Sequence, residues 1–239
     1  MQKRTNAVAV YPEYLADLNT LVCPSNPAGA NALELWDQGQ TPSSLWSGDG
    51  EVIQPFANDG IVQPCEVYEH PYIYFGWLVE QRMTDDKVNP LTGNTNAQDF
   101  EINIKALLAK LDSAPEEAIK TTEEDFELPE GTGSGDGKLI YRLREGIERF
   151  LITDVNDPAS TARAQSEIGV MWDTISDDEA FHFNHVPGGS NVLYLDGHVA
   201  FLKLANKYGN TFPMNQGGFV LHEFSHMKYE EEEDDEDDN

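Results

Sequence analysis

The pattern of apolar and polar residues predicts a β-hairpin in the C-terminal part of the chain. Asp196-Gly197 lies between two apolar runs, 192–195 and 199–202. Asp-Gly is a strong signal for a two-residue type I′ turn, because both central positions need a positive φ. Such a turn would put four apolar side chains on one face: Val192, Tyr194, Val199 and Phe201. The opposite face is apolar too, so we expect the hairpin to be covered on both sides.

Other apolar runs predict a mixed set of elements. Helical spacing indicates a helix over 97–111, with its apolar face made by Phe100, Ile104, Leu107, Leu108 and Leu111. The run YIYFGWLV at 72–79 is typical of a strand, and 139–143 and 169–172 suit shorter ones. We therefore expect an α+β fold in which an antiparallel sheet, with a central C-terminal β-hairpin, packs on helices between long loop insertions.

Length and composition predict a single globular domain with an appended tail. The chain has 239 residues, of which 39% are hydrophobic and 10% aromatic, enough to build a core. We expect one domain over 1–229. Four glycines in EGTGSGDG, 130–137, predict a loop or flexible break inside it. The run of like charges in 230–239 predicts a disordered acidic tail.

The charge balance limits the possible partners. There are 43 acidic and 15 basic residues, a net charge of −28. Such a surface repels nucleic acid and anionic membranes, so we expect no nucleic-acid partner. No stretch reaches the roughly 18 to 20 apolar residues of a membrane span, and residues 1–22 do not form an intact signal peptide. The chain is therefore either cytosolic or the part of an exported protein that follows its anchor helix.

The chain contains two cysteines, Cys23 and Cys65, which lie 42 positions apart and each adjoin a proline. In an exported protein we expect them to form a disulfide, which would stabilise the fold by about 4 kcal/mol in the chain-entropy model. The alternative is a pair of free, buried thiols.

The hairpin belongs to a longer motif. His185 is followed by the glycine-rich loop 187–190, an apolar strand and Asp196-Gly197. This order resembles the C-terminal motif of bacterial pilin-like proteins with a prepilin-type leader, although the ten residues between His185 and Asp196 are one more than usual. Looser similarity extends over most of 11–213, in YPEYLADLNTLVCPS, YIYFGWLV, IYRLREGIERFLITDVN and VMWDTIS. The family's leader is absent from this chain.

The resemblance implies a fold and a role. It implies a pseudopilin-like domain, displayed outside the inner membrane and anchored in its full-length form. It also implies a non-enzymatic structural or assembly subunit of a type II secretion or type IV pilus-like system. Its partners would be other pilin-like subunits or its own copies. His185 would then fix its loop through backbone hydrogen bonds, and a metal-binding or catalytic role is the alternative.

The resemblance also implies a calcium site, because secretion pseudopilins often bind calcium in a C-terminal loop. Four oxygen-bearing side chains precede the hairpin: Asp173, Asp177, Asp178 and Asn184. Calcium takes six to eight oxygen ligands, so this loop is chemically suitable. The alternative is a solvated acidic loop without an ion.

One segment indicates an enzyme instead. On a helix, His222 and His226 of LHEFSH would share a face and could bind zinc, with Glu223 as the general base of a metallohydrolase. A catalytic zinc needs a third protein ligand, and only the charged tail follows His226. We therefore expect no enzyme, and keep a zinc metallohydrolase and a secreted binding module as the alternatives.

Overall fold

The computed structural model describes most of the segments on which these expectations depend. The described residues are 15–26, 31–37, 40–42, 50–52, 58–62, 66–67, 71–113, 124–147, 149, 165–175, 184–185, 188–204 and 211–226. The predicted tail, 230–239, lies outside them. None of the helices in these segments combines the length and the apolar character that crossing a membrane requires.

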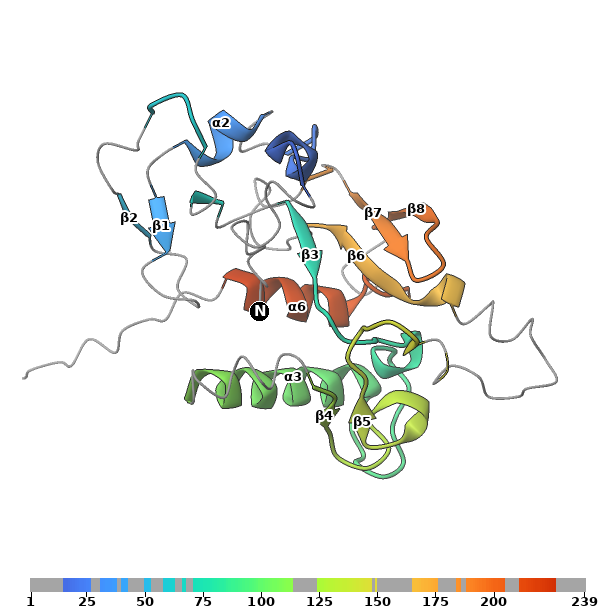
Figure 1. Ribbon diagram of the computed structural model, residues 1–239. Helices are drawn as coiled ribbons and strands as arrows, with labels where there is room; N and C mark the ends of the chain where they lie inside the picture. Colours follow the sequence, from blue (N-terminus) through green and yellow to red (C-terminus); the bar gives the residue numbers. More distant parts are fainter. Residues whose placement is uncertain are drawn as a thin grey trace, which may run out of the picture.

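The centre of the fold is a four-stranded antiparallel sheet (Figure 1). Its strands are β3 (Tyr72–Tyr74), β6 (Gly169–Asp173), β7 (Gly189–Tyr194) and β8 (Val199–Lys203), in the order β3-β6-β7-β8. Two small sheets pair β1 (Gln40–Pro42) with β2 (Gly50–Val52) and β4 (Phe126–Glu127) with β5 (Leu139–Ile140). The prediction of an α+β fold with an antiparallel sheet is confirmed.

Two helices cover one face of the central sheet and form the main core with it. They are α3 (Asn96–Ser113) and α6 (Gln216–His226), which pack against each other. The predicted apolar face of α3 is buried at Phe100, Ile104 and Leu107, which belong to the same core cluster as Trp172 and Val192 of the sheet. The side chains of Leu108 and Leu111 lie outside the described set. The predicted helix over 97–111 is confirmed.

The hairpin is present, but its turn differs from the predicted one. Tyr194 N donates to His198 O and Gly197 N donates to Tyr194 O, both at 2.9 Å. Gly197 has a φ of +89°. The loop therefore has three residues, 195–197, with glycine in the left-handed region, which is the second common way to close a hairpin. The predicted two-residue turn is wrong by one residue.

This change of register exchanges the faces of β8, because side chains alternate along a strand. Val192 now faces Ala200, and Leu193 faces Val199. Val192 and Tyr194 are buried, whereas Val199 is 61% exposed and Phe201 49% exposed. The expectation that both faces of the hairpin are covered is therefore wrong. Within the described part of the chain, β8 pairs only with β7 and forms the end of the sheet.

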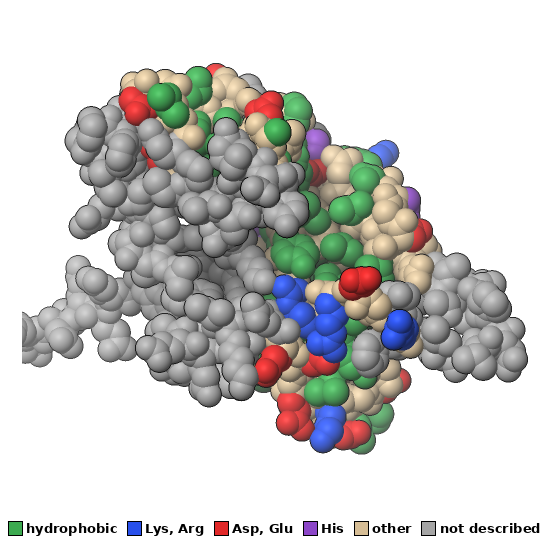
Figure 2. Space-filling model, viewed as in Figure 1, with side chains coloured by type: hydrophobic (Ala, Val, Ile, Leu, Met, Phe, Trp, Pro, Cys, Tyr) green, Lys and Arg blue, Asp and Glu red, His purple; other side chains and the backbone are tan. Residues whose placement is uncertain are grey.

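The predicted strand over 72–79 is divided at Gly76. β3 ends at Tyr74, and Gly76 turns the chain with a φ of +83°. The chain then leaves the central sheet, and Leu78 N donates to Tyr141 O at 2.8 Å. Arg142 covers the bend, and its guanidinium lies 5.3 Å from the Trp77 ring centre. On the side of the molecule drawn in Figure 2, Lys and Arg side chains gather below an area of hydrophobic side chains.

The glycine-rich segment 130–137 is a loop as predicted, but not a flexible break. It closes the β4–β5 hairpin and contains the short 3-10 helix η4 (Ser134–Asp136). Gly131 N and Gly133 N both donate to Gly137 O. Arg82, in the 3-10 helix η3 (Gln81–Met83), forms an ion pair with Asp136 and donates to Gly133 O at 3.1 Å. These bonds fix the loop to the neighbouring chain.

The N-terminal part has a small hydrophobic cluster of its own. It contains the 3-10 helix η1 (Leu18–Leu21) and α2 (Ala32–Trp36). Asp17 and Asn31 cap these helices by accepting hydrogen bonds from backbone N–H groups. The buried members of this N-terminal cluster are Leu18, Val22, Ala32, Trp36 and Val67. Among the described residues, they form a cluster separate from the main core.

The three-residue turn predicts how substitutions of Gly197 behave. Gly197→Ala should destabilise the fold by about 1–2 kcal/mol, because a Cβ disfavours the left-handed region. The site is open, with nothing within 4 Å of an added Cβ, so this cost comes from the backbone alone. Gly197→Asn should cost less, since asparagine tolerates this conformation. Urea unfolding of both variants would test this, and an equal loss in the two would contradict it.

Candidate functional site

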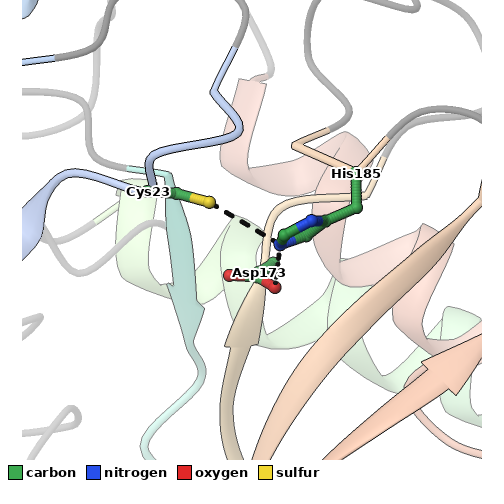
Figure 3. Close-up of side chains that lie close together, drawn as sticks. All are labelled: Cys23, Asp173 and His185. Carbon is green, nitrogen blue, oxygen red and sulfur yellow. Dashed lines mark hydrogen bonds and ion pairs between the residues drawn. The ribbon is translucent and has the colours of Figure 1, made fainter.

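Three polar side chains from distant parts of the sequence meet at the end of β6 (Figure 3). Cys23 follows η1, Asp173 is the last residue of β6, and His185 lies in the loop before β7. His185 Nε2 is 3.6 Å from Cys23 Sγ and 2.8 Å from Asp173 Oδ2. One ligand-type atom from each of the three lies within 4.8 Å of the others. We call this group the Cys23–Asp173–His185 cluster.

Asp173 is the anchor of the cluster. It is 2% exposed, and a carboxylate at such a position needs hydrogen-bond donors to offset the loss of water. Asn191 on β7 supplies two, because its backbone N and its side-chain Nδ2 donate to Asp173 Oδ2 at 2.7 and 2.8 Å. His185 Nε2 is the third neighbour of the same oxygen. The pairing of β6 with β7 thus places both the carboxylate and its donors.

The loop before β7 holds His185 in position. Gly188 N donates to His185 O at 2.8 Å, which closes a tight turn. Two hydrogen bonds hold the neighbouring Asn184 in place, because its backbone N donates to Thr174 O and its side-chain amide donates to Pro71 O. The ring of Phe201 on β8 meets the His185 ring edge-on, with 5.8 Å between their centres. The histidine is therefore fixed by the loop, by β7 and by β8.

Gly189 makes room for this arrangement. A Cβ at this position would lie 2.1 Å from Cζ of Phe201 and 2.9 Å from the backbone O of Leu202. Any larger residue would therefore push the Phe201 ring, which packs on His185. This explains one of the two consecutive glycines of the motif by close packing rather than by backbone conformation.

Cys23 is a buried thiol. It is 3% exposed and is a free cysteine in this structure. Burial raises the pKa of the Cys23 thiol, and the nearby Asp173 carboxylate adds to this rise, although hydrogen bonds with the Ser25 and Asn26 backbone oppose it. Burial, together with Cys23 and Asp173, also raises the pKa of Tyr72 to about 12. The surroundings thus disfavour further negative charge.

The geometry does not suit a nucleophilic cysteine. In a Cys-His-Asp relay the two ring nitrogens of the histidine have different partners, one the thiol and the other the carboxylate. Here a single nitrogen, Nε2 of His185, faces both Cys23 and Asp173. An activated thiol also needs a lowered pKa, whereas that of Cys23 is raised. The three ligand-type atoms lie close enough together that they could instead hold a metal ion.

The structure describes two of the four residues predicted to bind calcium. Asp173 contacts Asn191 and His185, while the amide of Asn184 is directed at Pro71 O. The side chains of Asp173 and Asn184 therefore contact different neighbours. Asp177 and Asp178 lie outside the described residues, so the calcium site stays a prediction.

The motif residues of the hairpin have structural contacts. Asp196 Oδ1 accepts hydrogen bonds from His198 N and His198 Nδ1, at 3.1 and 2.6 Å. The side-chain hydrogen bond from His198 lowers the pKa of Asp196. Gly197 supplies the left-handed residue of the turn. The ring of His185 differs from the expectation, because within the described residues its Nε2 contacts the side chains of Asp173, Asn191 and Cys23 rather than backbone groups.

Two other predicted groups are described only in part. The segment LHEFSH is helical within α6, as a zinc-binding pair would require, and His222 is buried. The side chains of Glu223 and His226 lie outside the described set. For the predicted disulfide, Cys65 lies outside the described residues. The zinc helix therefore remains a prediction, whereas Cys23 is a free thiol in this structure and forms no disulfide in it.

Each member of the cluster has a different role in the predictions made from the sequence. Cys23 was assigned to a disulfide, Asp173 to calcium, and His185 to the family motif. Cys23 and His185 are 162 positions apart, and no local spacing connects them. Of the predictions made from the sequence, the metal-binding alternative for His185 comes closest to the observed cluster.

Comparison of the chain with protein-family models, with curated proteins and with solved structures gave no match.

The bonds of Asp173 predict a large effect of its removal. Asp173→Ala should lower the free energy of unfolding by about 3–5 kcal/mol, because two donors of Asn191 and the His185 ring lose a buried acceptor. Urea unfolding in the presence of a chelator would measure this loss without any contribution from a metal. Asp196→Ala, in the exposed turn, is the control and should lose much less. Equal losses in the two variants would show that Asp173 is not an anchor.

Proposed function

We propose that this chain is a non-enzymatic, pilin-like structural subunit that acts outside the inner membrane. Its partners would be other pilin-like subunits or further copies of itself. The observation that carries the proposal is the use of the motif residues. His185, Gly189, Asp196 and Gly197 all contribute to the shape or the attachment of the β7–β8 hairpin. A motif used in this way supports a scaffold rather than a reaction.

The chemistry of the cluster supports the same reading. A hydrolase with a cysteine nucleophile needs a thiolate and a histidine that can pass on a proton. Burial raises the pKa of the Cys23 thiol, and Nε2 of His185 is already adjacent to the Asp173 carboxylate. The cluster is thus suited to holding chain segments together.

The proposal also draws on coarse features of the fold. A pseudopilin-like domain packs a long N-terminal helix on an antiparallel sheet, with the motif hairpin near the C-terminus. Here the antiparallel sheet and its C-terminal hairpin are present, and the helices that share the core with the sheet are α3 and α6. The sheet and the hairpin are therefore the parts of the fold that support the proposal.

The outer face of the hairpin offers a surface for assembly. Val199 and Phe201 are exposed on a strand that ends the sheet in the described part of the chain. Exposed apolar side chains on such a strand favour contact with another protein surface. A structural subunit needs a contact of this kind in order to assemble. In a protein that stays unassembled, the same exposed apolar side chains lower the solubility.

Location and assembly of the full-length protein in its own cells test the proposal. We expect the protein in the periplasmic or cell-surface fraction, where chemical crosslinking should join it to pilin-like subunits or to its own copies. Val199→Glu should reduce these crosslinks because it puts a charge into the proposed contact. Ile102→Glu is the matched control, since Ile102 is similarly exposed but lies on α3. A cytosolic, uncrosslinked protein would contradict the proposal.

A further inference from the structure

We propose that Cys23 Sγ, His185 Nε2 and Asp173 Oδ2 bind a single transition-metal ion of the zinc type. The ion would join the N-terminal segment to the central sheet. This inference is independent of the proposed function, because a structural metal site can occur in a protein of any class. Metal binding would be a shared role of Cys23, Asp173 and His185, which the sequence places in a disulfide, a calcium site and a family motif.

The spacing of the three atoms suits a tetrahedral ion. With a Zn–S bond of about 2.3 Å and a Zn–N bond of about 2.0 Å, the sulfur and the nitrogen are about 3.5 Å apart. Cys23 Sγ and His185 Nε2 are 3.6 Å apart. His185 Nε2 and Asp173 Oδ2 are 2.8 Å apart, so this pair has to open by about half an ångström to admit the ion.

The kinds of donor atom identify the class of metal. A thiolate, an imidazole and one carboxylate oxygen are ligands of zinc and of similar ions, whereas calcium and magnesium prefer all-oxygen sites. The described surroundings of Asp173 therefore suit zinc better than the predicted calcium.

The neighbours of the three residues keep them in place. The side-chain Nδ2 of Asn191 donates to Asp173 Oδ2 at 2.8 Å, and Gly188 N donates to His185 O. Phe201 packs edge-on against the His185 ring. Neighbours of this kind orient metal ligands, and their loss commonly costs about 10–100-fold in affinity. Asn191→Ala should therefore weaken zinc binding by about that factor.

Binding exchanges protons for the ion. The Cys23 thiol releases its proton to solvent as the metal–sulfur bond forms. His185 binds through the lone pair of Nε2, so its ring proton is carried on Nδ1. The raised pKa of the Cys23 thiol means that the metal competes with a tightly held proton. No redox change is involved.

The position of the site explains what the ion would do. Cys23 belongs to the segment next to the N-terminal cluster of Leu18, Val22 and Trp36, whereas Asp173 and His185 belong to the sheet and its loop. These two parts have separate hydrophobic clusters. An ion held by both would close a loop of 162 positions and fix one part on the other.

Cobalt titration of the whole, purified chain tests the site. The protein is stripped with a chelator, kept reduced with a phosphine and titrated with Co²⁺. We expect one equivalent to produce the near-ultraviolet absorption of a cobalt–thiolate bond together with the visible bands of tetrahedral cobalt. Zinc should abolish both signals by displacing cobalt. The thiolate absorption matters here because the acidic tail has carboxylates but no sulfur.

Matched variants locate the site. Cys23→Ser and His185→Gln should lose the thiolate absorption, and near-ultraviolet circular dichroism would verify that they are folded. Cys65→Ser and His226→Ala should keep it. Absence of the absorption in the unaltered chain would overturn the proposal without any variant. Loss of the absorption in Cys65→Ser but not in Cys23→Ser would also overturn the proposal. Stabilisation of the folded protein by Ca²⁺ but not by Zn²⁺ would overturn it as well.

Discussion

A buried carboxylate at the end of β6 is the interaction on which the surrounding structure depends. Asp173 is almost fully removed from water, so its charge has to be matched by donors held close to it. The donors are Asn191 on β7 and His185 in the preceding loop, and their bonds to this carboxylate fix their positions. Cys23 then joins through the same ring nitrogen. One charge thus sets the relative positions of a strand end, a loop and the N-terminal segment.

The two hydrophobic clusters show why this interaction has consequences beyond its own residues. The main core holds the sheet on α3 and α6, whereas Leu18, Val22 and Trp36 pack in a separate cluster. Apolar burial stabilises each cluster but has no directional preference for their relative placement. Polar contacts are directional, and those of the Cys23–Asp173–His185 cluster therefore supply orientation where the apolar contacts do not.

The sequence predicted elements well where a local pattern determines them. The helix α3 follows from the spacing of Phe100, Ile104 and Leu107, and the hairpin follows from Asp196-Gly197 between apolar runs. Its register did not follow, because Asp-Gly fits both two-residue and three-residue loops and the strands are apolar at nearly every position. Gly76 divides a strand that looked continuous, because its φ of +83° turns the chain out of the sheet. The meeting of Cys23, Asp173 and His185 arises from tertiary structure, which residue spacing does not encode.

The pairing of β3 with β6 has a consequence for how the chain folds. Tyr72 and Asp173 face each other across about a hundred residues of sequence, whereas β7 and β8 are joined by a three-residue loop. Local contacts form quickly, and distant ones require a slow loop closure. We therefore expect the hairpin and α3 to form early and β3 to dock late. Because Cys23 precedes β3 in the chain, its approach to His185 would be among the last events, and its burial would mark a completely folded molecule.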